Sequence, residues 1–298
     1  MSTHNSLPRA TRRSERPDMA ARPDDLRGSS LLAVFAHPDD ESLACGGLLA
    51  RCADLGAQVS LLCVTHGEHG QSKGLGQARA CPERAFASRR ARELREASRV
   101  LGIANLVLLH YEDGMLPWAD AGRLEADIHA AIRRFGPHVV ITFDEDGLYW
   151  HPDHIAVHER TTAAVAAMGE NGPALYYVTM PPGCMRAVVQ HARETLASRG
   201  LDRQPPLRVL GIADPDAFGA LAAAPTLIVE APDFASRKLA AIRCHHSQLA
   251  DDALMFVSES DAARLLRVEH YRRAQVGSRR ATFIDRFAES DRMKTRVD

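Results

Sequence analysis

The stretch Ser30-Leu-Leu-Ala-Val-Phe-Ala-His-Pro-Asp-Asp-Glu41 decides how this chain folds. Residues 31–36 form an unbroken apolar run, and a short run without polar alternation is typical of a strand that is buried on both faces. One histidine and three acidic residues follow within the next five positions. Because ligands of open parallel sheets bind beyond the carboxyl ends of the strands, this stretch predicts a parallel sheet with a functional edge.

Similar apolar runs alternate with amphipathic segments on the C-terminal side of this stretch. Strands are predicted at residues 30–36, 58–65, 106–109, 138–143, 174–179 and 226–230, and helices at 44–55, 84–101, 122–135, 154–168, 186–199 and 235–248. This alternation predicts an α/β, Rossmann-like fold, with a mostly parallel sheet and helices on both of its faces. The pattern weakens after about residue 175, which predicts an irregular C-terminal third.

The composition sets the broad class of protein. The chain has 298 residues, of which 45% are hydrophobic and 25% charged, and its formal net charge is −1. A balanced charge provides no field that attracts nucleic acid, and no apolar run reaches the roughly 20 residues that span a bilayer. The six cysteines show no C-x-x-C spacing. We therefore expect a soluble cytoplasmic protein without nucleic-acid or membrane partners, and a homo-oligomer is compatible with the sequence.

The N-terminal segment differs from the rest of the chain. Residues 1–28 are rich in Arg, Ser, Pro and Asp and contain no apolar segment. Such a composition leaves nothing to pack into a core. We expect a disordered arm over residues 1–28 and a single domain over residues 29–298.

The acidic turn after the first strand suggests a metal site. His37 and Asp40 are three residues apart on a tight turn and can converge on one ion, whereas Asp39 between them points elsewhere. A mixed nitrogen and oxygen ligand set suits zinc or a similar divalent metal. The alternative is a turn in which one aspartate caps the next helix. Two aspartates and a glutamate exceed what one cap requires, and this favours the metal site.

A second cluster follows the strand predicted at residues 138–143, in the segment Tyr149-Trp-His-Pro-Asp-His154. Because parallel strands end at one edge of a sheet, either His151 or His154 can complete a set with the first cluster. The other histidine is then free for acid–base chemistry or for stabilising an oxyanion. His158, one helical turn further on, is a weaker candidate ligand for which we favour a purely polar role.

In these motifs the chain resembles the zinc-dependent N-acetylglucosaminyl deacetylases of the PIG-L/LmbE type. The resemblance covers about residues 30–275, and its most specific parts are residues 36–41 and residues 147–154. The weaker matches are Gly46-Gly47, Val64-Thr-x-Gly67-Glu68-x-Gly70, Arg90-x-x-Glu93, Asp113-Gly114-x-Leu116, Lys238-x-x-Ala241-x-x-x-His245-x-Ser-Gln248 and Glu269-His-Tyr271. The order and spacing of so many motifs make a chance match implausible.

The resemblance implies a hydrolase that uses a metal-activated water to remove the N-acetyl group of an N-acetylglucosamine-type amino sugar or glycoside. The implied cofactor is Zn²⁺, and Fe²⁺ also suits such a site. The residues that would bind the metal are His37, Asp40 and His154. The implied general base is Asp39.

The resemblance also assigns roles around the substrate. His151 would stabilise the oxyanion or protonate the leaving amine, Asp153 would orient His151, and Tyr149 would polarise the acyl carbonyl. The residues that would line the sugar site are Arg90, Asp113 and Glu68. The family usually has glycine where this chain has Trp150, and an indole at that position would suit stacking on a sugar ring.

Two other functions fit the same motifs. One is an amidase that acts on a related sugar–thiol conjugate, and the other is a non-catalytic module that binds a metal or a sugar. The unligated Asp39 argues against a binding module, because binding alone needs no base. Residues 181–224 match no motif of the family, and we expect this region to influence substrate choice.

Overall fold

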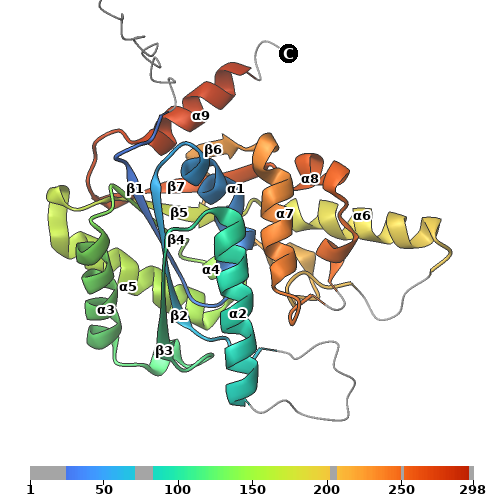
Figure 1. Ribbon diagram of the computed structural model, residues 1–298, viewed down its shortest axis with the longest axis horizontal. Coiled ribbons are helices and arrows are strands. Elements are labelled where there is room, and N and C mark those ends of the chain that lie inside the picture. The colour runs from blue at the N-terminus through green and yellow to red at the C-terminus, as the bar shows by residue number, and fades with distance from the viewer. Residues whose placement is uncertain (1–24, 71–82, 202–206, 250–251, 295–298) are drawn as a thin grey trace, which may run out of the picture.

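A computed structural model shows how the strands assemble (Figure 1). The structure describes residues 25–70, 83–201, 207–249 and 252–294. Within these ranges, seven strands form one sheet in the order β3-β2-β1-β4-β5-β7-β6. The first five strands pair in parallel, whereas β7 runs antiparallel to both β5 and β6. The predicted α/β fold with a mostly parallel sheet is confirmed, and the continuous sheet supports the proposal of a single domain.

All the strands and helices predicted from the sequence are present in the predicted order, and the described residues form one further strand and three further helices that were not predicted. The strands are β1 (Ser30–Phe35), β2 (Gln58–Thr65), β3 (Asn105–Tyr111), β4 (Val139–Phe143), β5 (Ala174–Thr179), β6 (Leu227–Glu230) and β7 (Val268–Gly277). The helices are α1 (Asp40–Asp54), α2 (Glu83–Leu101), α3 (Ala121–Phe135), α4 (Gly147–Trp150), α5 (Pro152–Met168), α6 (Cys184–Ser198), α7 (Ala235–Cys244), α8 (Glu259–Leu265) and α9 (Phe283–Lys294).

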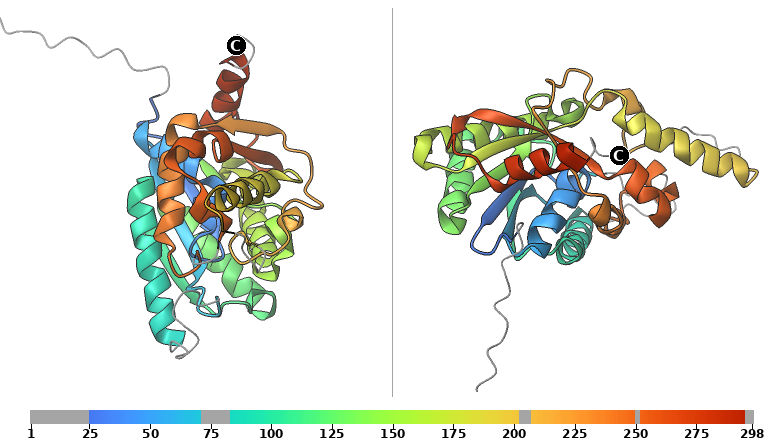
Figure 2. Two further views of the ribbon diagram at one scale, coloured as in Figure 1. Left: turned by 90° about the vertical axis from the view of Figure 1, so that its right-hand side faces the viewer. Right: turned by 90° about the horizontal axis from the view of Figure 1, so that it is seen from above.

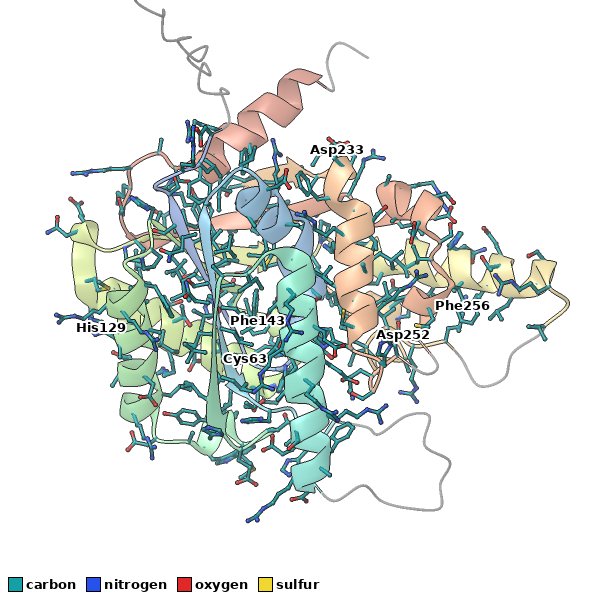
Figure 3. The ribbon with its side chains drawn as sticks, in the orientation of Figure 1. Cys63, His129, Phe143, Asp233, Asp252 and Phe256 are labelled. Carbon is teal, nitrogen blue, oxygen red and sulfur yellow. The ribbon has the colours of Figure 1, made fainter. Side chains whose placement is uncertain are left out.

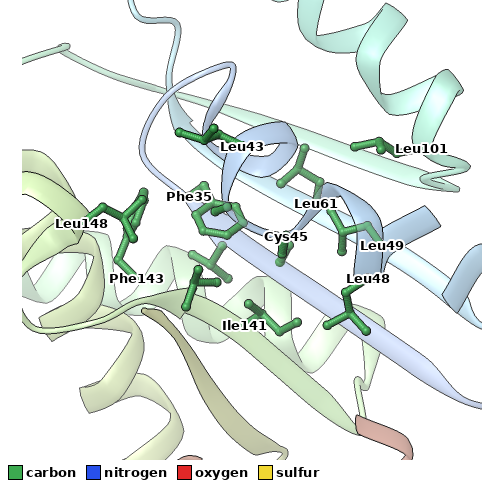
Figure 4. Packing of buried hydrophobic residues seen from close by; sticks show 14 of the residues in the cluster. Phe35, Leu43, Cys45, Leu48, Leu49, Leu61, Leu101, Ile141, Phe143 and Leu148 are labelled. Carbon is green, nitrogen blue, oxygen red and sulfur yellow. The ribbon is translucent and has the colours of Figure 1, made fainter. Parts of the chain in front are cut away.

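Helices cover both faces of the sheet. In Figures 1 and 2, α3 and α5 lie on one face, and α1, α2 and α7 lie on the other. Figure 4 shows the core on the α1 side, where Leu48 and Leu49 of α1 pack over Phe35, Leu61 and Ile141 of the central strands. All five side chains are fully buried. This core fixes the end of β1, and hence the acidic turn, in the middle of the sheet edge.

Helix α1 starts earlier than predicted and is broken. The sequence predicted a helix over residues 44–55, but α1 begins at Asp40 and has a non-helical residue at Cys45, with φ −145° and ψ 22°. The acidic turn therefore runs directly into the helix.

The second half of α1 is capped by a distant glutamate. The carboxylate of Glu269 accepts hydrogen bonds from the backbone N–H groups of Gly47 (2.8 Å) and Leu48 (2.9 Å), and it forms a buried ion pair with Lys238 (2.7 Å). A Cβ atom on Gly47 would lie only 3.1 Å from Glu269 Oε1, so a larger side chain would crowd this cap. At the helix break, the Gly46-Gly47 motif therefore lies against Lys238 and Glu269, which belong to two motifs that are distant in the sequence.

Strand β7 and helix α9 were not predicted. Strand β7 carries several charged residues, and a segment with this pattern does not predict a strand inside a sheet. Each charge has a partner: Glu269 pairs with Lys238, Arg272 with Asp144, and Arg273 with Asp285. Because pairing removes most of the cost of burying charge, the strand tolerates them.

The C-terminal end of the expected arm is part of the folded core. Leu26 lies within the expected arm, yet it is 1% exposed, and its backbone N–H donates to the carbonyl of Leu55 at 2.8 Å. The expectation for residues 1–24 lies outside the described residues. In the described part of the chain, no helix combines the length and the apolar character that a bilayer crossing requires. A cytoplasmic location and self-association stay predictions.

Candidate active site

A cavity of about 300 Å³ opens at the carboxyl edge of the sheet, where the segments after β1, β2, β3 and β4 meet. Six of the residues singled out in the sequence line it: His37, Asp39, Arg90, Asp113, Tyr149 and His151. They come from four different segments, so only the fold brings them together. Strand ends of this kind supply ligand-binding groups in open α/β sheets.

Three side chains converge beside this cavity, and one of them, His37, lines it. Nδ1 of His37 lies 3.1 Å from Nε2 of His154, which lies 3.2 Å from Oδ1 of Asp40. Oδ2 of Asp40 lies 3.5 Å from Nδ1 of His37. His154 is fully buried and stacks on Phe143, with ring centroids 4.0 Å apart; Phe143 is labelled in Figure 3.

The outer contacts of the two histidines turn their lone pairs toward each other. Nε2 of His37 faces Asp113 Oδ1 at 3.0 Å and Asp153 Oδ2 at 3.1 Å, so this nitrogen carries the hydrogen. Nδ1 of His154 donates to the carbonyl of Gly147 at 3.0 Å. In neutral rings the two inward nitrogens are then acceptors that face an acceptor carboxylate, and this arrangement requires a positive charge between them, either an added proton or a metal ion.

The charges around this group agree with a cation site. Burial alone would lower the pKa of His37, but Asp113, Asp153 and Asp40 raise it well above its usual range. Burial would raise the pKa of Asp40, yet His154 and His37 hold it well below its usual range. A positive charge is therefore favoured here, as a proton on His37 or as a metal ion. Two imidazoles with one carboxylate form a ligand set that suits a divalent metal.

His151 is close to this group but has a different bonding pattern. One nitrogen each of His37, His151 and His154 lies within 4.8 Å of the others, so His151 is also within reach of an ion. Its Nδ1 accepts the backbone N–H of Asp153 at 3.2 Å, which leaves the hydrogen of the neutral ring on Nε2. Burial, together with His154 and His37, lowers the pKa of His151 to about 4. His151 is thus built as a neutral hydrogen-bond donor.

Asp39 faces the same cavity but is held apart from the three converging side chains. Its Oδ2 accepts a hydrogen bond from Arg90 at 3.0 Å. Burial raises the pKa of Asp39 to about 6, although Arg90 opposes the rise. A carboxylate with this pKa can take up and release a proton near neutral pH, which is what a general base requires.

Asp153 lies in the expected place but contacts a different histidine. The sequence predicted that Asp153 orients His151. Only the backbone N–H of Asp153 reaches His151; its carboxylate contacts His37 and accepts the N–H groups of Gly114 (2.7 Å) and Leu116 (3.1 Å). Asp153 therefore orients His37, because the helix start turns its side chain under the loop that follows β3.

The expected substrate contacts are distributed unevenly. Arg90 lines the cavity, but its guanidinium is held by Asp39 and by the carbonyls of Pro38 and Gly67. Asp113 also lines the cavity, with one carboxylate oxygen on His37 and the other on the backbone N–H of His69. Both residues position other groups of the site.

Glu68 and Trp150 lie outside the cavity lining. Glu68 accepts the backbone N–H of Asp113 at 3.0 Å and borders a neighbouring cavity next to α2. Trp150 is 49% exposed and adopts a left-handed φ of 67°. Glycine reaches that conformation without strain, which gives a physical reason for glycine at this position in the family. Tyr149, by contrast, lines the cavity, and burial holds its pKa well above the usual range.

Several lining residues were not singled out in the sequence. Gln248 lies in a matched motif but had no assigned role, and His69 follows β2 in a glycine-rich segment. Residues 210–212 reach the cavity from the region without family motifs. Backbone pairing between Val209 and Ile212 folds that region back on itself. No local sequence pattern predicts that these residues contact the cavity.

Comparison with known proteins gives a consistent result. Residues 32–165 match the model of the PIG-L family, described as GlcNAc-PI de-N-acetylase. The chain is 33% identical to a 1D-myo-inositol 2-acetamido-2-deoxy-alpha-D-glucopyranoside deacetylase of Mycolicibacterium vanbaalenii over an alignment of 245 positions, which covers 76% of this chain and 82% of that protein.

Solved structures share the fold. The N,N'-diacetylchitobiose deacetylase of Pyrococcus horikoshii has a TM-score of 0.56 and 23% identity, with 83% of this chain and 84% of that chain covered. The 4-carboxy-2-hydroxymuconate hydratase of Pseudomonas putida has a TM-score of 0.57 and 18% identity, with 85% and 98% covered. Because a deacetylase and a hydratase both match, the fold alone does not determine the reaction.

Proposed function

Since this chain belongs to the PIG-L family, we propose that it is a metal-dependent N-deacetylase that acts on an N-acetylglucosamine-type amino sugar or glycoside. One observation carries the proposal: the inward nitrogens of His37 and His154 meet Asp40 within 3.5 Å, and the carboxylate of Asp39 faces the same cavity from a separate position. A binding module needs only the first feature, whereas hydrolysis needs both.

The residues His37, Asp40 and His154 would hold the metal ion. When bound, a divalent cation polarises a carbonyl group and makes a water molecule more acidic. Zn²⁺ suits two imidazoles and one carboxylate, and Fe²⁺ is also compatible with this ligand set.

Hydrolysis of the amide then requires a base and two donors from the protein. Asp39 takes a proton from the attacking water as the oxygen of that water bonds to the acyl carbon of the acetyl group. The Nε2–H of His151 and the phenol of Tyr149 donate hydrogen bonds to the oxygen of the former carbonyl, which becomes negative. The C–N bond breaks as the amine takes the proton held by Asp39, and the acyl group leaves as acetic acid, which ionises to acetate in solution. Because His151 is neutral, its role is hydrogen-bond donation, and Asp39 carries the proton.

The cavity supports a small substrate group. About 300 Å³ is close to the lower end of the range for ligand pockets and suits one sugar ring with its acetamido group. The relative from Mycolicibacterium vanbaalenii carries the name of a deacetylase for such a sugar linked to inositol. The part of the substrate beyond the sugar would then extend past residues 210–212, which line the cavity.

The experiment that tests this function measures amine release. Purified protein would be stripped of metal with a chelator, reloaded with Zn²⁺ or Fe²⁺, and offered N-acetylglucosamine, diacetylchitobiose and N-acetylglucosaminyl-inositol. We expect fluorescamine-reactive amine and acetate in equal amounts from at least one substrate, lost with the chelator and restored by metal. Metal-loaded protein that binds these sugars and releases no amine from any of them would support a binding module instead.

A further inference from the structure

A buried glutamate and a buried histidine lie directly behind Asp39. Glu41 is fully buried, and its Oε2 accepts the backbone N–H of Asp39 at 3.1 Å. Its other oxygen, Oε1, faces Nε2 of His245 at 2.9 Å and accepts the hydroxyl of Ser42 at 2.5 Å. His245 is also fully buried and lies just beyond the end of α7, more than 200 residues away in the sequence.

The backbone that Glu41 contacts is strained. Asp39 has φ 118° and ψ −27°, a backbone conformation that residues other than glycine rarely adopt. Such a conformation persists only where the surroundings hold it. In the described residues, Glu41 accepts the backbone N–H of Asp39, and Arg90 donates to the carboxylate of Asp39.

The contacts that Glu41 and Arg90 make with Asp39 share one support. Arg90 lies on α2, and so does Glu93, whose carboxylate accepts both the backbone N–H (3.0 Å) and the hydroxyl (2.6 Å) of Ser247. Ser247 is two residues after His245, in the turn that follows α7. Helix α2 thus fixes Arg90 directly, and it fixes His245 through this turn.

We propose that Glu41 and His245 form a buried positioning pair that holds the backbone of Asp39 in its left-handed conformation, so that its carboxylate faces the reacting water. The proposal rests on the function proposed above, because it explains how the base of that reaction is held. Neither residue lines the cavity, so both act through Asp39 and not on the substrate.

The test removes the acceptor and then restores it. Glu41→Met keeps the side-chain length but cannot accept the Asp39 N–H, whereas Glu41→Gln retains an acceptor oxygen. We expect Glu41→Met to lower kcat by about tenfold or more, with KM and metal content within twofold of the native values, and Glu41→Gln to recover most of the loss. His245→Phe should give a similar loss, and Glu41→Met combined with His245→Phe should lose no more than the worse single variant.

A second cycle separates positioning from general damage. In an Asp39→Asn background, Glu41→Met should change kcat by less than about twofold, because the residue through which it acts is already disabled. An equal loss of kcat in both backgrounds would overturn the proposal, and so would a fall in metal content, which would mean that Glu41 acts through Asp40.

Tyr271→Phe is a matched control. Tyr271 is fully buried and donates to Glu269 at 2.8 Å, and Glu269 caps the later half of the same helix. This variant should lower Tm and leave kcat unchanged.

Hydrogen exchange gives a readout that needs no substrate. The backbone N–H of Asp39 should exchange faster in Glu41→Met than in Glu41→Gln. If the Asp39 N–H exchanges faster in Glu41→Met, and the wild-type protein deacetylates no amino sugar, the positioning pair is supported and the proposed function is overturned. Unchanged exchange in Glu41→Met, with deacetylation intact, would overturn the pair alone.

Discussion

Nδ1 of His37 and Nε2 of His154 lie 3.1 Å apart, and each ring has its other nitrogen bonded to a fixed acceptor. Two neutral imidazoles arranged in this way repel each other unless something positive lies between them and Asp40. The relationship depends on β1 and β4 being neighbours in the sheet, since each histidine follows one of these strands.

The first prediction concerns the metal ligands. His37→Ala, Asp40→Ala and His154→Ala should each reduce bound metal well below one ion per chain, because each removes one of three ligand atoms. His158→Ala is the matched control: His158 lies one turn further along α5 and donates to the carbonyl of Phe143, so metal content should stay native. Metal analysis of the four purified proteins checks this, and full retention in all three ligand variants would contradict the assignment.

The second prediction concerns Asp153. Asp153→Asn should weaken metal affinity by about 10- to 100-fold, because the carboxylate that orients His37 is lost. Competition with a chelating dye measures the affinity. Native affinity together with a reduced kcat would instead favour the role that the sequence assigned to Asp153, which is to orient His151.

Much of the fold could be predicted because the central strands are uniformly apolar. Strands β1, β2, β4 and β5 and their covering helices follow from runs and periodicities of hydrophobic residues. Strand β7 could not be predicted in this way, because its charged residues are paired with Lys238, Asp144 and Asp285, which belong to other elements of the fold.

The same distinction between local sequence patterns and tertiary contacts applies to the candidate site. Local motifs predicted that His37 and Asp40 lie close to either His151 or His154, and the family resemblance selected His154. Contacts that depend on tertiary structure could not be predicted. These are the contact of Asp153 with His37, the position of Trp150 outside the cavity lining, and the presence of residues 210–212 in that lining. A sequence pattern gives the position of a side chain along the chain, but not the direction in which it points.

The third prediction concerns pH. The pKa of Asp39 is about 6, raised by burial, and a cation nearby would lower it. Because protonated Asp39 cannot accept a proton, kcat/KM should fall as the pH drops through a value at or below about 6. His151→Gln should lower kcat and leave this acidic limb in place. A limb that moves or disappears in His151→Gln would assign it to the histidine.

The fourth prediction concerns Trp150. Because its φ is 67°, Trp150→Gly should be more stable than Trp150→Ala by about 1 kcal/mol, which denaturant unfolding measures. Both variants lack the indole, and since it lies outside the cavity lining, KM for a single-ring sugar should stay within about twofold. A clear rise in KM in both variants would show that the indole stacks on the substrate.

The most direct test of the central claim compares Asp39→Asn with Asp40→Asn, two adjacent residues to which the structure gives different partners. Zinc stoichiometry and kcat would be measured for both. Asp39→Asn should keep its metal and lose kcat by on the order of 10²–10⁴, the usual contribution of a positioned base. Asp40→Asn should lose metal and activity together and recover part of both with excess Zn²⁺. If Asp39→Asn is the variant that loses zinc, the assignment of base and ligand is contradicted.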